Sequence, residues 1–68
     1  MEDNMNKSQE YHFYYKDRMV LVIESSRCPV RLCEKIEISI RDDWMTLSVH
    51  QIEITLEGHV KVTLISLD

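Results

Sequence analysis

The feature that most constrains the fold is a two-residue alternation of apolar and polar side chains in the middle of the chain. Isoleucine occupies positions 36, 38 and 40, and a second alternating run starts at Trp44. This period is typical of β-strands that bury one face. Asp42 and Asp43 lie between the runs and favour a two-residue turn. The pattern predicts a β-hairpin that pairs Ile40 with Met45, Ile38 with Leu47 and Ile36 with Val49.

The second strand of this hairpin changes the parity of its apolar positions. They are odd-numbered up to Val49 and even-numbered from Ile52 onward. One extra residue, His50 or Gln51, must therefore be absorbed, and a β-bulge that bends the strand would absorb it. A three-residue loop at positions 57–59 surrounds the only glycine and predicts a further turn. This loop would pair Leu56 with Val60, Ile54 with Val62 and Ile52 with Leu64.

The N-terminal half predicts another hairpin. Aromatic residues at positions 11, 13 and 15 precede an unbroken apolar run at positions 19–23. A turn about Asp17 and Arg18 would join the two strands, with aromatic and β-branched side chains in contact across them. Residues 1–10 are polar and acidic without an apolar period, which predicts a flexible arm. In this register Phe13 pairs with Val22 and Tyr15 with Val20.

Residues 25–35 fit two structures, a short helix at 28–35 or an irregular connection. Pro29 suits the first turn of a helix, but isolated helices of this length are marginal. A helix would be amphipathic. One face would carry Cys28, Leu32 and Ile36, and another would carry Arg27, Arg31 and Lys35.

Together these patterns predict an all-β fold, a five-stranded antiparallel meander or small open barrel, with strands near 11–16, 18–24, 36–41, 44–56 and 59–67. Residues 11–68 would form one small β domain. The last strand is apolar on both faces, so we expect it to need a partner, either another part of the fold or a second copy of the chain.

Composition excludes several classes of function. One glycine in 68 residues disfavours phosphate-binding loops, and a net charge of −4 disfavours generic nucleic-acid binding. No apolar run is long enough for a membrane helix and no targeting segment is visible, so we expect a cytoplasmic protein. The three histidines, His12, His50 and His59, lack metal-ligand spacing, so neither a metal nor a cofactor is expected. Cys28 and Cys33 are expected to be reduced and to act as small buried hydrophobes.

The function that we predict is a non-enzymatic protein-interaction or regulatory module that self-associates, with no catalytic residues and no small-molecule substrate. The absence of alanine and the seven isoleucines suggest an AT-rich gene, such as that of a phage or mobile-element inhibitor of a host protein. The candidate partner-binding features are a tryptophan that is either an exposed anchor or a cover for the core edge, a histidine at a bulge, and a terminal strand that is apolar on both faces. These residues are Trp44, His50, Val60, Val62, Leu64, Ile65 and Leu67.

The alternative function is binding of single-stranded nucleic acid by a small β-barrel. Aromatic side chains along one strand can stack on bases, and basic residues near them can contact phosphates. The candidate residues are Tyr11, Phe13, Tyr15, Arg18, Arg27, Arg31 and Lys35.

Overall fold

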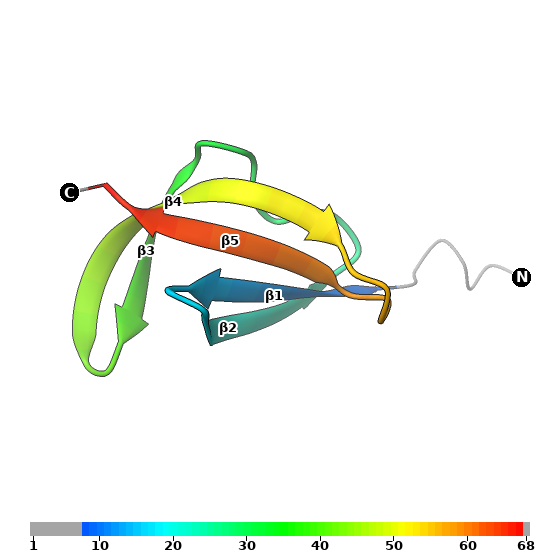
Figure 1. Cartoon of the computed structure of the whole chain (residues 1–68), viewed down its shortest axis with the longest axis horizontal. Helices are drawn as coiled ribbons and strands as arrows, with labels where there is room; N and C mark the ends of the chain where they lie inside the picture. Colours follow the sequence, from blue (N-terminus) through cyan, green and yellow to red (C-terminus); the bar gives the residue numbers. More distant parts are fainter. Residues whose placement is uncertain (1–7, 68) are drawn as a thin grey trace, which may run out of the picture.

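The computed structural model describes residues 8–67, which form one sheet of five strands and no helix. The strands are β1 (Gln9–Tyr15), β2 (Arg18–Ser25), β3 (Lys35–Ile40), β4 (Asp43–Ile54) and β5 (Val60–Ser66). The sheet curves into half of a barrel (Figure 1). The all-β prediction is confirmed. Of the predicted N-terminal arm, residues 1–7 lie outside the described residues, and its last two residues are the first two of β1.

The strand order is β2-β1-β5-β4-β3, and the sheet is mixed. β1 and β5 are parallel, whereas the other three neighbouring pairs are antiparallel. The predicted antiparallel meander is therefore wrong in one pairing. A meander would leave β5 at an edge, but β5 lies in the centre between β1 and β4. The apolar pattern of the last strand did predict a need for partners, and β1 meets that need within the same chain.

The core lies on the inner, concave face of the sheet and draws on four strands. β1 and β5 contribute alternate residues that face each other in register, such as Phe13 beside Val62. β4 and β3 contribute the alternating residues that the sequence pattern identified. The buried hydrophobic residues are Tyr11, Phe13, Ile38, Leu47, Val49, Val60, Val62 and Leu64.

Two hairpins of the sheet turn through two residues with left-handed backbone conformation. Arg41 and Asp42 have φ angles of 53° and 69°, and Lys16 and Asp17 have φ angles of 52° and 64°. Positive φ at both central residues defines the type I′ turn, whose twist matches that of the flanking strands. Each turn thus has a basic residue followed by an aspartate, a residue type that tolerates this conformation.

The predicted β3–β4 register was displaced by two residues. The turn was expected at Asp42 and Asp43, but Asp43 is already the first residue of β4 and pairs with Ile40. The same displacement occurs between β4 and β5, where Ile54 pairs with Val60. A shift of two keeps every side chain on its face, because side chains alternate with a period of two. The observed pairs are Ile38 with Met45, Ile36 with Leu47, Ile52 with Val62 and Val49 with Leu64.

The bulge predicted in β4 is confirmed. Val49 pairs with Leu64 and Gln51 pairs with Thr63, so His50 is the extra residue. A second irregularity, between β1 and β2, was not predicted: Phe13 pairs with Leu21 and Tyr14 pairs with Met19, which leaves Val20 extra. The β2 sequence is apolar at consecutive positions, so it carried no parity change that could reveal a bulge. The predicted pairs Phe13 with Val22 and Tyr15 with Val20 are therefore wrong, and Tyr15 pairs with Arg18.

Residues 26–34 form an irregular connection from one sheet edge to the other, and the helix at 28–35 is absent. Their backbone bonds to β4 rather than within a helix: the Cys33 N–H donates to the Val49 carbonyl (2.8 Å), and the Val49 N–H donates to the Glu34 carbonyl (2.9 Å). A turn closes through the Glu34 N–H and the Arg31 carbonyl at 3.1 Å. Backbone N–H and C=O groups of this segment therefore find hydrogen-bond partners on β4 and within a turn, so a helix is not needed to pair them.

We predict that Asp42→Gly stabilises the protein by about 1 kcal/mol, because glycine adopts positive φ without the steric cost that a Cβ atom imposes. Urea unfolding followed by circular dichroism measures the change. The neighbouring Asp43→Gly is the matched control, because Asp43 lies in β4 and glycine weakens a strand by about 0.5–1 kcal/mol. Equal effects of the two substitutions would contradict the assigned turn.

We also predict that Leu47→Ala costs about 2–5 kcal/mol, since Leu47 is fully buried and truncation leaves a cavity. A domain of this length has a total stability of about 3–10 kcal/mol, so this variant loses a large share of its stability and melts at a clearly lower temperature than the wild type. Thermal melts of Leu47→Ala and of Leu56→Ala, whose side chain is fully exposed, provide the comparison. A melting temperature of Leu47→Ala close to that of the wild type would refute this core.

Candidate functional site

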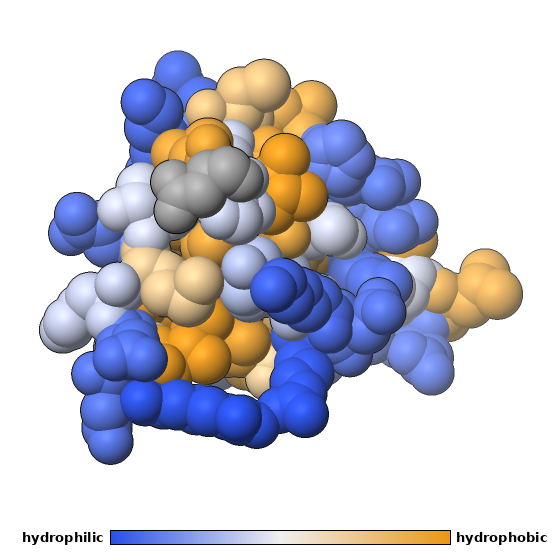
Figure 2. Space-filling model, turned by 60° about the vertical axis from the view of Figure 1, so that its left-hand side comes forward, coloured by the Kyte–Doolittle hydropathy of each residue, from blue (hydrophilic) through white to orange (hydrophobic). Residues whose placement is uncertain are grey.

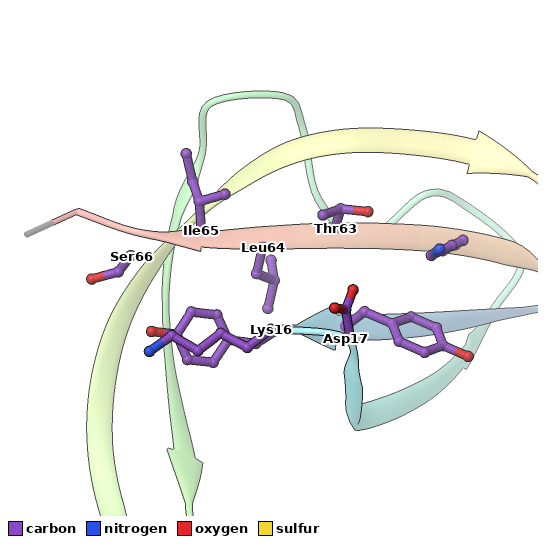
Figure 3. A pocket seen from close by; sticks show the side chains of 9 residues that line it. Lys16, Asp17, Thr63, Leu64, Ile65 and Ser66 are labelled. Carbon is purple, nitrogen blue, oxygen red and sulfur yellow. The ribbon is translucent and has the colours of Figure 1, made fainter.

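The predicted partner-binding residues separate into two groups. Val60, Val62 and Leu64 face inward from β5 and belong to the core, so they are not available to a partner. The others lie at the surface: Trp44 is 75% exposed, and Ile65, Leu67 and His50 are exposed as well. Figure 3 shows the division within β5, where Leu64 and Ile65 point in opposite directions from the strand.

Strand register places Trp44 and Ile65 on the outer, convex face of the sheet. Ser48 pairs with Ile65, and residues paired directly across two strands share a face. Trp44 lies four residues before Ser48 in the regular part of β4 and therefore shares that face. Leu67, just beyond β5, lines a hollow of about 370 Å³ together with Trp44. The start of β4 and the end of β5 thus contribute to one apolar surface.

The same surface continues across β1 and β2. Tyr14 lies beside Thr63 in the parallel pairing and opposite Met19 in the antiparallel pairing, and Thr63 is two residues before Ile65. Met19 is half exposed. We call these residues the outer apolar strip: Met19, Tyr14, Ile65, Leu67 and Trp44. Figure 2 shows how hydrophobic residues reach the surface between hydrophilic ones on the side of the molecule that faces the viewer.

A hollow of about 460 Å³ interrupts the strip between Tyr14 and Ile65. It forms where β1 ends and turns away while β5 continues, so that the Lys16–Asp17 turn lies across from Ile65 and Ser66 (Figure 3). Its cationic groups lie over aromatic rings: Lys61 Nζ is 5.1 Å from the centroid of the Tyr14 ring, and Lys16 Nζ is 5.5 Å from that of Tyr15. The hollow therefore combines apolar walls with two ammonium groups.

The residues of the predicted nucleic-acid surface do not come together. Tyr11 and Phe13 are core residues, 7% and 0% exposed, so neither ring can stack on a base. Arg18 begins β2, whereas Lys35 begins β3, and these strands are the opposite edges of the sheet. Arg27 and Arg31 are exposed in the connection between those edges, and Tyr15 is half-buried beside the hollow. No continuous face of aromatic and basic groups results from this set.

Sequence reasoning missed a stacked pair of histidines. The rings of His12 and His59 are parallel, with centroids 3.8 Å apart. A glutamate accompanies each ring: Glu10 Oε1 lies 3.0 Å from His12 Nε2, and Glu57 Oε1 lies 3.9 Å from His59 Nδ1. The two histidines are far apart in sequence, and only the parallel β1–β5 pairing brings them together. Across residues 8–67, no group of three or more histidine, cysteine, aspartate or glutamate side chains is arranged to hold a metal ion.

Both cysteines are exposed free thiols, so the expectation that they are small buried hydrophobes is wrong. They lie in the irregular connection, which reaches over the sheet end and packs against the core only through Val30. Cys28 Sγ donates to the Val30 carbonyl at 3.1 Å. The prediction of burial depended on a helix that would carry Cys28 and Leu32 on an inner face, and that helix does not form.

We predict that both thiols react with Ellman's reagent in the native protein, with two equivalents released per chain without denaturant, because exposure gives the reagent access to each sulfur. Addition of urea should leave the stoichiometry unchanged. The single variants Cys28→Ser and Cys33→Ser assign each equivalent. A thiol that reacts only in urea would contradict its exposed position.

No helix in the part of the chain that the structure describes could span a membrane. No protein-family model, no curated protein and no solved structure matches the chain. The fold defines a small all-β domain with a curved mixed sheet, and its surface chemistry is the basis for a function.

Proposed function

We propose that the protein is a small non-enzymatic protein-interaction module that regulates or inhibits a partner protein, and that the outer apolar strip is its binding surface. In this proposal the protein acts by binding and not by catalysis. It self-associates, and it works in the cytoplasm, where its two free cysteines remain reduced. The small size and the alanine-free composition fit a phage or mobile-element inhibitor of a host protein.

The exposure of Trp44 is the observation that carries this proposal. Trp44 is 75% exposed although tryptophan is among the residues that gain most from burial. Tryptophan is also enriched among the few residues that dominate binding energy at protein interfaces. The adjoining hollow, with Leu67 in its wall, offers a concave site beside this side chain. Exposed apolar side chains surrounded by polar residues are typical of a protein-interaction site.

The charges beside the strip favour a particular partner. Lys16 and Lys61 line the hollow of about 460 Å³ together with one carboxylate, that of Asp17, so cationic groups are in excess there although the chain as a whole carries a net charge of −4. An apolar segment that carries a carboxylate would complement this hollow, with its apolar part on Ile65 and its charge near the lysines. Such a partner would be selected by apolar contact and oriented by charge.

We predict that Trp44→Ala removes partner binding without unfolding the protein. The side chain is mostly exposed, so its loss costs little stability, whereas removal of an interface anchor weakens binding by about 30-fold or more. Proteins retained by the immobilised wild type from an extract of the source cells are quantified against those retained by Trp44→Ala. The affinity of a retained protein is then measured with purified components by calorimetry.

The matched control is Leu56→Ala, which removes a fully exposed apolar side chain at the β4–β5 turn, outside the strip. This variant should retain the same protein with unchanged affinity. Equal loss in both variants would contradict a specific role for the strip. Tight, steeply salt-dependent binding of single-stranded oligonucleotides, with no protein dependent on Trp44, would instead favour the nucleic-acid function.

A further inference from the structure

Strand β3 forms an open edge of the sheet with a regular backbone. Its pairing with β4 has no irregularity from Lys35 to Ile40, whereas the other edge strand, β2, contains a bulge. Bulges on edge strands discourage pairing with another chain, and β3 lacks this protection. Among the two edges of the described sheet, β3 is therefore the better template for an added strand.

The direction of the unpaired backbone groups follows from the ladder. The Glu34 carbonyl accepts a bond from the Val49 N–H, so Glu34 faces β4. In an antiparallel ladder, successive residues alternate between facing the neighbour and facing away. The backbone groups of Lys35, Glu37 and Ser39 therefore face the open side. A strand added here must form its backbone hydrogen bonds with residues of this set.

Charge selects one self-pairing among the registers that this edge allows. If β3 paired with β3 of a second copy about Glu37, two carboxylates would lie directly opposite. If the two-fold axis passed through Ile38, Glu37 would lie opposite Ser39 of the partner subunit and Lys35 would reach only the turn residue Arg41, so no opposite charges would meet. With the axis at Ile36, Lys35 lies opposite Glu37 of the partner subunit, and the same contact forms twice by symmetry. Opposite charges across strands stabilise pairing, and like charges destabilise it.

The inner face agrees with this register. Ile36 is half-buried at the edge of the core, and the two-fold axis places it against Ile36 of the partner subunit. β-branched pairs across strands are favourable contacts, and here the contact also covers an apolar side chain that the monomer leaves partly exposed. Lys35 and Glu37 are both exposed, so each is available for the pairing.

We propose that β3 pairs antiparallel with β3 of a second copy, with Lys35 opposite Glu37 of the partner subunit, to form a symmetric dimer with one continuous sheet. This inference deepens the self-association in the proposed function by assigning it an edge, a register and two charge contacts. The dimer leaves the outer apolar strip uncovered, because a strand added at an edge extends the sheet without covering its faces.

The test uses charge reversal at both positions. Wild-type protein should sediment as a species of twice the 8.1 kDa chain mass at micromolar concentration. Lys35→Glu places a carboxylate opposite Glu37 of the partner subunit, and Glu37→Lys places an ammonium group opposite Lys35 of the partner subunit. Each variant should dimerise at least about tenfold more weakly, since each reverses two contacts.

The decisive sample is an equimolar mixture of the two variants. One chain then carries two carboxylates on β3 and the other carries two ammonium groups, so both contacts are attractive and a heterodimer should form. The double variant K35E/E37K should likewise regain the homodimer. Circular dichroism checks that each chain is folded, and Arg18→Glu, a charge reversal on the β2 edge, should dimerise as the wild type does.

Three results would overturn the inference: a monomeric wild type over a tenfold concentration range, single variants that dimerise like the wild type, or a mixture that stays monomeric. Failure here is distinguishable from failure of the proposed function. If the charge variants leave dimerisation unchanged while Trp44→Ala still loses its partner, only the register is wrong. If heterodimer rescue succeeds while no partner depends on Trp44, the self-association holds and the strip has no assigned role.

Discussion

The parallel pairing of β1 with β5 is the interaction on which the rest of the structure depends. It joins the N-terminal hairpin to the C-terminal part of the sheet, and among the strands of residues 8–67 it is the only pairing that does so. Phe13 and Val62 lie side by side because of it, and both are fully buried. Without this pairing the chain would consist of a two-stranded hairpin and a three-stranded sheet. An isolated two-stranded hairpin is marginal in water, so the pairing provides the cooperativity of the fold.

The same pairing creates the surface features. It places Tyr14 beside Thr63, so the part of the outer apolar strip on β1 and β2 lies next to the part on β4 and β5. It stacks His12 on His59, and it forms the larger hollow because β1 stops before β5 does. It also decides which strands are edges: β5 is enclosed on both sides, and β2 and β3 are left open. The regions open to a partner are therefore consequences of one central contact.

The two edges differ in how open they are. β2 is bulged and carries exposed apolar side chains, such as Met19 and Val22, while β3 is regular and alternates polar residues, two of them charged, with isoleucines. Charges along an edge favour one partner and one register over others, whereas an apolar face gains affinity when its surface is buried against a partner. The separation of these two chemistries allows one chain to carry a self-association edge and a separate surface for a different protein.

Residue patterns alone determined which side chains of β3 and β4 face the core, where β4 is bulged and that the fold is all-β. These features depend on parity, and the parity of Ile38 or Leu47 is visible in the sequence because the strand period is two. Tertiary structure decided the strand order and the register. The observed register differs from the predicted one by two residues. Registers that differ by two place the same side chains on each face, so the sequence pattern could not distinguish them and the turn backbone selected one. It also decided that Val60, Val62 and Leu64 are core and that Trp44 remains a surface residue, because burial depends on which strand lies next to which. The alternation within a strand shows which side chains share a face but not which strand lies beside it. The β1–β5 pairing joins segments far apart in the sequence, so no pattern within either segment predicts it.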